Sequence, residues 1–118
     1  MMLAYKNRFH GYNSLRYVYK HGHVVRSKYV TLKYSHNPRR TTPRVSVVVS
    51  KKVLKSAVGR NRIRRRMYEQ IRLLLPFCPP QRDIVCIVVA AEVKTMTTEQ
   101  LNTMVLTLFK EAHLYTEA

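Results

Sequence analysis

The net positive charge of this sequence lies entirely in its front part, where no acidic residue neutralises it. The first 68 residues hold 18 lysines and arginines, whereas the first carboxylate is that of Glu69. The last 50 residues carry four basic and six acidic side chains, so the formal net charge of +16 comes from the front part. Uncompensated charge of this density repels itself in the free protein, and a polyanionic partner would relieve that cost.

The charge is densest in residues 51–72, which read KKVLKSAVGRNRIRRRMYEQIR and contain nine basic residues and one acid. Five of the seven positions 60–66 are arginine. Phosphates accept arginines through charge-assisted, often bidentate hydrogen bonds, and each neutralised phosphate releases counterions. A solvated helix face is the alternative interpretation, but such faces usually mix both signs. We therefore expect a nucleic acid as the partner.

The length of 118 residues suits one domain over residues 1–118 with a modest core. A hydrophobic content of 46% is too high for a disordered basic tail. No apolar run approaches the roughly 18–20 residues that span a bilayer, and the start lacks the stretch of about 7–15 apolar residues of a secretory signal. Cys86 lies in the apolar run IVCIVVAA, which favours a buried thiol over a disulfide with Cys78 or a metal ligand. A reduced, cytoplasmic setting without membrane attachment is expected.

Periodicity and chain-breaking residues predict a helix over 13–22, strands over 28–34 and 45–49, a helix over 56–75, a strand over 83–91 and a helix from residue 97. Asn13 and Gly22 begin and end the first helix, and Ser56 caps the long one. Thr97 and Gln100 match a capping box. This order predicts an α+β fold, with helices packed on a mixed sheet.

The long helix has two distinct sides on a helical wheel. One side faces the core and consists of Ile63, Met67, Ile71 and Leu74. The opposite side consists of Asn61, Arg65, Tyr68 and Arg72, flanked by Arg62, Arg64 and Arg66. The periodicity that buries one side therefore stacks guanidinium groups on the other.

Aromatic residues are interleaved with the basic ones. Seven of the eleven Phe and Tyr residues precede residue 35: Tyr5, Phe9, Tyr12, Tyr17, Tyr19, Tyr29 and Tyr34. Rings among cations suit single-stranded nucleic acid, because each stacked base contributes roughly 1–3 kcal/mol. The alternative is that the rings fill the core, which we favour for Phe9 and Tyr12 and leave open for Tyr19, Tyr29 and Tyr34.

The segment SKKVLKSAVGRNRIRRRMYEQ resembles the signature of the protein subunit of bacterial ribonuclease P. The positions that match the family are Lys51, Lys52, Ala57, Arg60, Asn61, Arg62, Arg64, Arg65 and Glu69 in this segment, and Arg8, Phe9, Val18, Tyr19 and Gly22 near the start. The sequence departs at Tyr68, where an arginine is usual, and at Leu15, where a phenylalanine is common. Arg66 and Arg72 are candidates to replace the missing arginine. The resemblance covers roughly residues 7–112.

The resemblance implies a fold and a function. The fold is a two-layer α+β sandwich with a four-stranded mixed sheet, about three helices and a left-handed strand–helix–strand crossover, although general rules make about 98% of such crossovers right-handed. The function is that of a ribonuclease P subunit, in which a catalytic RNA uses Mg²⁺ to cleave the 5′ leader from precursor tRNA. The protein binds that RNA through the arginine helix and holds the single-stranded leader in a central cleft.

The resemblance also assigns site residues. The residues that it implies bind RNA are Lys51, Lys52, Arg60, Asn61, Arg62, Arg64, Arg65, Arg66 and Arg72. The residues that it implies line the leader cleft are Leu15, Tyr19, Tyr29, Leu32 and Tyr34. Leu32 and Tyr34 are alternatives for one family position. Asn61 could orient a hydrated metal or a phosphate, or serve only in helix capping. The partners are the RNA subunit and the leader, and no obligate protein partner is evident.

No catalytic residue is expected in the protein itself. Its six acids are spread singly, and no Ser/His/Asp or Cys/His grouping is visible. For His21 and His23 we favour an exposed, RNA-facing position over zinc binding.

Three other functions are alternatives: a small ribosomal-type RNA-binding protein, a helix that reads a DNA major groove, and a protein-only nuclease. The arginines cover more than half of the helix circumference, which suits folded RNA better than one groove, and a protein-only nuclease would need clustered acids.

Overall fold

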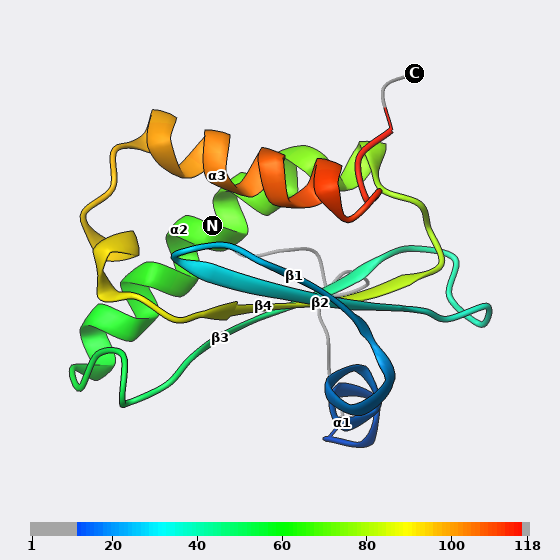
Figure 1. Cartoon of the computed structure of the whole chain (residues 1–118), viewed down its shortest axis with the longest axis horizontal. Helices are drawn as coiled ribbons and strands as arrows, with labels where there is room; N and C mark the ends of the chain where they lie inside the picture. Colours follow the sequence, from blue (N-terminus) through cyan, green and yellow to red (C-terminus); the bar gives the residue numbers. More distant parts are fainter. Residues whose placement is uncertain (1–11, 117–118) are drawn as a thin grey trace.

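The computed structural model describes residues 12–116, with side chains from residue 15 onward. Along the chain the elements are α1 (Tyr12–His21), β1 (His23–Arg26), β2 (Val30–His36), β3 (Arg44–Val49), α2 (Ala57–Leu74), η2 (Leu75–Phe77), β4 (Arg82–Val88), η3 (Ala91–Lys94) and α3 (Thr98–Glu111). Figure 1 shows a sheet with α2 and α3 on one face and α1 on the other. The predicted α+β architecture is confirmed.

The four strands form one mixed sheet in the order β1-β2-β4-β3. The pairs β1–β2 and β2–β4 are antiparallel, whereas β3 and β4 run parallel. The connection between β3 and β4 passes through α2, so this is the crossover for which the resemblance implies a left-handed path.

Residue periodicity alone did not predict β1, and it placed the start of β2 too early. The amide and the hydroxyl of Ser27 both donate to the carbonyl oxygen of Val30, at 3.0 and 2.8 Å. This pair of bonds makes residues 28 and 29 the turn of a hairpin, whose first strand is only four residues long. Three of those four residues are exposed, so β1 carries no buried alternation that a sequence pattern could reveal.

The main core lies between the sheet and the α2–α3 layer. The strands supply Val30, Leu32, Val45, Val47, Val49, Ile84, Cys86 and Val88 to it. The helices supply Ile63, Met67, Ile71, Leu74, Leu101, Val105, Leu108 and Phe109, which confirms the predicted buried side of α2. Each fully buried aliphatic side chain of this kind contributes about 1.5–3 kcal/mol to folding.

On the opposite face, α1 packs on the centre of the sheet through Val18, which like Val85 of β4 is fully buried. The helix begins at Tyr12, so Asn13 lies within its first turn and the predicted cap position is wrong. Gly22 follows the helix as predicted, and its amide donates to the carbonyl oxygen of Val18 at 2.8 Å. A Cβ atom here would lie 2.5 Å from that oxygen and 2.9 Å from the carbonyl oxygen of Tyr34, so glycine is required.

The predicted caps of the two long helices are present. The hydroxyl of Ser56 accepts a hydrogen bond from the amide of Gly59 at 3.1 Å. Thr97 and Gln100 exchange both bonds of a capping box, at 3.0 and 3.1 Å. Such caps satisfy amide groups that have no partner within the helix and are worth about 1 kcal/mol each.

Both cysteines are buried and unpaired. Burial raises the pKa of the Cys86 thiol to about 12, and it raises the pKa of the Cys78 thiol to about 12 although nearby Arg82 opposes the shift. Cys86 belongs to the core between the sheet and the helices, as its apolar surroundings in the sequence predicted. Between residues 12 and 116, no helix is long and apolar enough to cross a membrane.

Candidate nucleic-acid interface

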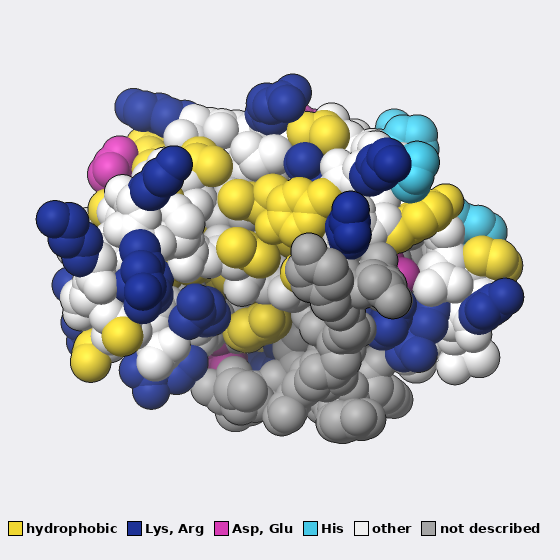
Figure 2. All heavy atoms as spheres, turned by 90° about the horizontal axis from the view of Figure 1, so that it is seen from below, with side chains coloured by type: hydrophobic (Ala, Val, Ile, Leu, Met, Phe, Trp, Pro, Cys, Tyr) yellow, Lys and Arg dark blue, Asp and Glu magenta, His cyan; other side chains and the backbone are white. Residues whose placement is uncertain are grey.

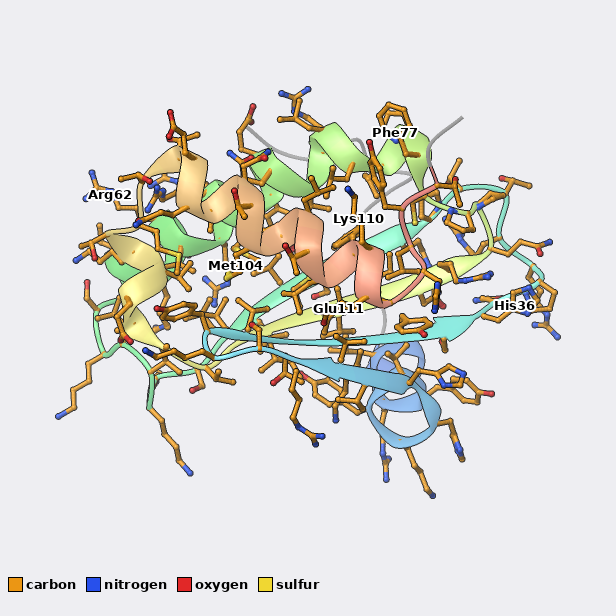
Figure 3. The ribbon with its side chains drawn as sticks, turned by 45° about the horizontal axis from the view of Figure 1, so that its top comes forward. His36, Arg62, Phe77, Met104, Lys110 and Glu111 are labelled. Atoms are coloured by element: carbon orange, nitrogen blue, oxygen red, sulfur yellow. The ribbon has the colours of Figure 1, made fainter. Side chains whose placement is uncertain are left out.

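Basic side chains crowd the end of the molecule where β3 leads into α2. We define the cationic ridge as Lys51, Lys52, Lys55, Arg62, Arg64 and Arg65, all of which are at least partly exposed. Figure 2, which looks at the α1 side of the sheet, shows Lys and Arg side chains gathered at this end. Arg62 projects outward from the same end in Figure 3. Within residues 12–116, the structure contains no ion pair that involves a member of the ridge.

Arg60 organises the turn that presents the three lysines of the ridge. Its guanidinium donates to the carbonyl oxygens of Leu54 and Lys55, at 3.0 and 2.7 Å. Gly59 allows the turn to approach the helix, because a Cβ there would lie 2.6 Å from a methyl carbon of Leu54. Arg60 therefore holds the turn in place, and only the guanidinium donors that these two bonds leave over remain for another partner.

Arg62, Arg64 and Arg65 differ in how their guanidinium groups are held. The guanidinium of Arg64 donates to the side-chain oxygen of Asn61 at 2.6 Å, so Asn61 orients this arginine. The guanidinium groups of Arg62 and Arg65 have no hydrogen bond to any part of the chain that the structure describes. A hollow of about 280 Å³ is lined by Asn61, Arg64, Arg65 and Tyr68. The donors of Arg62 and Arg65 are thus available to phosphate oxygens.

Arg66 does not belong to the ridge, although the sequence interpretation grouped it with its neighbours. Its guanidinium donates to the carbonyl oxygens of Val93 and Lys94, at 2.9 and 2.8 Å, and also to that of Met96. These three bonds attach η3 and the start of the α3 segment to α2. Because its donors are occupied by the backbone, the structure gives Arg66 a role in the fold.

Tyr68 is half-buried, although the helical wheel placed it on the exposed side of α2. Its hydroxyl accepts a hydrogen bond from the amide of Val47 at 3.0 Å. Since β3 is at the edge of the sheet, this amide points away from the neighbouring strand, and Tyr68 satisfies it. The departure from the family pattern at this position therefore exchanges a cation for a contact with the sheet edge.

Arg72 forms the one ion pair within residues 51–72. Its guanidinium lies 2.6 Å from the carboxylate of Glu69, and this hydrogen bond lowers the pKa of Glu69. The Glu69 charge offsets that of Arg72, so Arg72 offers less positive potential to a partner than Arg62 or Arg65. The family usually has an arginine where this chain has Tyr68. Neither Arg66 nor Arg72 can replace that arginine, because the guanidinium groups of both are already bound within the chain.

On the α1 side of the sheet, Tyr19 and Lys33 lie together. The ammonium of Lys33 is 5.0 Å from the centre of the Tyr19 ring, a cation–π contact. Tyr19 is 38% exposed, and partial burial raises the pKa of its hydroxyl. Leu15, half-buried on the same helix, completes the part of the predicted leader cleft that lies on this side. An exposed ring next to a cation is the arrangement that binds an unpaired base and its phosphate.

The other predicted cleft residues lie on the opposite face of the sheet. Leu32 is fully buried in the core beneath α2 and α3, so it cannot contact RNA, and this prediction is wrong. Tyr34 packs against the same core, and its ring centre lies 5.2 Å from that of His23. Tyr29 also contacts the core and lines a groove of about 650 Å³ that includes the carboxylates of Glu92 and Glu99. Consecutive strand residues point to opposite faces, so Lys33, one of the cations interleaved with the tyrosines but not among the predicted cleft residues, occupies the α1 side instead.

Residues 12–116 contain no group of three or more His, Cys, Asp or Glu side chains that could hold a metal ion. His21 and His23 are both exposed, and each makes a ring contact with a tyrosine, Tyr17 at 4.8 Å and Tyr34 at 5.2 Å respectively. Phe9 lies outside the residues that the structure describes, and the side chain of Tyr12 does so too.

A family model described as Ribonuclease P matches residues 3–113. The ribonuclease P protein component of Pseudanabaena sp. is 39% identical over 74 residues, which are 63% of this chain and 64% of that protein. The corresponding protein of Rippkaea orientalis is 37% identical over 92 residues, covering 72% and 70% of the two chains. The match therefore spans less than two thirds of the length of the Pseudanabaena relative.

Solved structures agree with these matches. The RNase P protein of Staphylococcus aureus superimposes with a TM-score of 0.82 at 26% identity, covering 93% of this chain and 98% of that one. The RNase P protein of Thermotoga maritima, at 21% identity and a TM-score of 0.76 over 94% and 98% of the chains, shows the shared fold.

The mixed sheet, the long helix and the unpaired cations of the ridge define a small α+β protein of the kind that binds nucleic acid. With the family match over residues 3–113, the chain belongs to the ribonuclease P protein family.

Proposed function

We propose that this chain is the protein subunit of a cytoplasmic ribonuclease P and that it assists a catalytic RNA in removing the 5′ leader of precursor tRNA. The observation that carries the proposal is the cationic ridge, whose members have no ion pair in the described chain and therefore lack charge compensation. In water such charges stay hydrated, whereas against an RNA surface each can neutralise a phosphate.

The ridge would bind the RNA subunit. Arg62 and Arg65 offer guanidinium groups with free donors, and Asn61 fixes the direction of Arg64. Arg60 holds the turn that carries Lys51, Lys52 and Lys55. Neutralising closely spaced phosphates lowers the repulsion within a folded RNA, which reduces the concentration of Mg²⁺ that the RNA needs. Mg²⁺ held by the RNA subunit would activate the attacking water and stabilise the developing charge.

The α1 side of the sheet would bind the leader. Figure 2 shows hydrophobic side chains gathered near the centre of this face, with dark blue basic side chains around them. Tyr19 offers a ring for one base, and Lys33 stands 5.0 Å from that ring, within reach of the adjoining phosphate. Mature tRNA has no leader, so contacts here would favour the precursor over the product.

Reconstitution with a bacterial ribonuclease P RNA tests the proposal. Cleavage of precursor tRNA at a low Mg²⁺ concentration should rise when the protein is added, and the protein alone should cleave nothing. A small ribosomal-type RNA-binding protein, the alternative, would bind RNA without raising cleavage. If addition of the protein leaves the rate unchanged at every Mg²⁺ concentration, the proposal is wrong.

A further inference from the structure

The outer edge of β1 is open, at the opposite side of the sheet from β3. The strand order β1-β2-β4-β3 gives β1 one neighbour, β2. The amide of Ser27, directly after β1, donates to Val30 of β2 at 3.0 Å and so points toward β2. Successive residues of an antiparallel strand turn their N–H and C=O groups to alternate sides, so those of Val24 and Arg26 point outward. Within residues 12–116, these outward groups have no hydrogen-bond partner.

The side chains of β1 divide between the two faces of the sheet. Val25 packs against the core on the α3 side, whereas Val24, which pairs with Lys33, lies on the α1 side and is 39% exposed. Arg26 follows two positions after Val24, so its exposed side chain lies on the α1 side as well. A strand placed beside β1 would pair with the outward backbone groups and cover Val24.

A groove lies between the β1–β2 hairpin turn and the start of α3. Its volume is about 650 Å³, and its half-buried lining residues are Tyr29, Met96 and Met104. Met104 lies between α3 and the hairpin in Figure 3. The other lining residues are polar and exposed: Glu92, Thr95, Glu99, Gln100 and Thr103. The groove therefore has an apolar floor, whose thioethers adapt to the shape of a guest side chain, and a polar rim.

The two faces of the edge attract different side chains. Because α3 packs against β1, the groove lies on the same side of the sheet as Val25. A strand beside β1 would send alternate side chains to this side and to the α1 side. The carboxylates of Glu92 and Glu99 at the rim repel acids, so the side chains that enter the groove must be apolar. On the α1 side, Arg26 has no ion pair within the described chain and attracts an acidic side chain.

The charge of the chain and the backbone groups of the edge together decide which partner fits. With a formal net charge of +16, two copies of the chain repel each other, which disfavours pairing of β1 with β1 of a second copy. A nucleic acid is attracted, but it lacks the paired N–H and C=O groups that repeat about every 7 Å along a strand. An acidic polypeptide satisfies both the charge and the backbone groups, and addition of a strand to an open edge is a recurring mode of peptide recognition.

We propose that an extended segment of an acidic partner protein adds to the sheet as a fifth strand beside β1. Its backbone forms hydrogen bonds with the outward N–H and C=O groups of Val24 and Arg26. Its side chains alternate between acidic residues, which face Arg26 on the α1 side, and apolar residues, which enter the groove at Met96 and Met104. This inference goes beyond the proposed function, because the partner is a protein and the RNA subunit takes no part in the contact.

The probe is a capped eight-residue peptide of alternating glutamate and valine. Fluorescence anisotropy measures its affinity for the full-length protein at about 150 mM salt, where screening limits non-specific charge attraction to about 8 Å. Hydrogen exchange of the Val24 and Arg26 amides should slow when the peptide binds, because these amides then donate to its backbone. Unchanged exchange of both amides at saturating peptide, or no binding of the peptide at all, would overturn the proposal.

Backbone-methylated peptides test strand pairing without altering the protein. One peptide carries N-methyl groups on its glutamates and another on its valines, so both keep every side chain. Only alternate residues of a strand donate to a given neighbour, so one of the two peptides should lose about tenfold in affinity and the other little. Loss with methylated glutamate indicates antiparallel pairing, and loss with methylated valine indicates parallel pairing. Equal affinities of the two would mean that the peptide does not bind as a strand.

Substitutions in the protein test the side-chain contacts. Arg26→Ala should weaken peptide binding about threefold, because it removes an exposed charge partner. Met104→Gln keeps the length of the side chain but not its apolar surface, and it should weaken binding about fivefold. Arg65→Ala is the matched control, because it removes the same charge from the cationic ridge and should leave peptide affinity at the wild-type value. If Arg65→Ala weakens binding as much as Arg26→Ala, the peptide binds by charge alone and β1 is not its site.

Discussion

Neighbouring arginines on α2 have unlike roles, and the difference lies in what each guanidinium touches. The guanidinium of Arg65 is exposed and has no hydrogen bond to the described chain, whereas that of Arg66 donates to three backbone carbonyls of the segment that precedes α3. A long side chain can turn back to the backbone or extend into water, and its angle on the helical wheel does not decide between them. The sequence therefore predicted the run of positive charge, but it could not predict which arginines are exposed and which bind the backbone.

Substitution of these two arginines should separate binding from stability. Arg65→Ala should weaken RNA-subunit binding and reduce the salt dependence of binding by about one phosphate, with unfolding stability changed by less than about 0.5 kcal/mol. Arg66→Ala should cost about 2–3 kcal/mol of stability, because it removes charge-assisted bonds and leaves carbonyls unpaired. Urea unfolding and RNA titration at two salt concentrations measure both effects. Arg65→Lys keeps the charge and should restore part of the affinity; equal destabilisation by both alanine variants would contradict the assignment.

Tyr19 should act on the substrate and not on the RNA subunit. Tyr19→Ala removes the ring beside Lys33 and should lower affinity for precursor tRNA by about tenfold, because one base loses its stacking surface. Affinity for mature tRNA and for the RNA subunit should stay unchanged. The measurement is the ratio of precursor to mature tRNA affinity in the reconstituted complex. Tyr19→Phe serves as the control because it keeps the ring, and a loss as large as that of the alanine variant would argue against stacking.

At the level of whole elements, the sequence predicted what depends on local chemistry. The caps at Ser56 and Thr97 and the buried side of α2 follow from nearest neighbours and helical spacing, and the structure has them. The faces of β2 were assigned wrongly for a different reason. The alternation from Val30 to Ser35 places Leu32 in the core, but the family position suggested it for the cleft. The register of a strand is fixed by its turn and its partners, which no single position reveals.

The edge strand β3 provides a test at this scale. Tyr68→Phe removes the acceptor for the Val47 amide and should cost about 1 kcal/mol of stability. It should also speed hydrogen exchange of that amide while leaving RNA binding unchanged. Tyr115→Phe is the matched control, since the Tyr115 hydroxyl has no hydrogen bond within the described chain and its loss should change stability little. Unaltered protection of the Val47 amide in Tyr68→Phe would show that the bond does not stabilise the sheet edge.

For the whole molecule, the uncompensated charges that we propose to bind RNA also destabilise the free protein by repelling one another. Residues 12–116 contain two ion pairs, Arg44–Asp83 and Arg72–Glu69, against a formal net charge of +16 for the chain. Repulsion among the basic side chains therefore outweighs the attraction within these two ion pairs, and salt, which screens both, reduces the repulsion more. Salt should consequently act in opposite directions on folding and on binding.

The melting temperature of the free protein should rise as NaCl increases from about 10 to 300 mM, because the Debye length falls from about 30 Å to less than 10 Å and screens the repulsion. Over about 50 to 200 mM salt, affinity for the RNA subunit should fall on the order of 10³-fold if about six phosphates are neutralised. Thermal unfolding of the protein alone and RNA titration in the same buffers measure both trends. Arg65→Ala should make both responses shallower, whereas Ser35→Ala should alter neither. A melting temperature that falls with salt would mean that attractive pairs dominate, and then the ridge could not be the free cationic surface on which RNA binding depends.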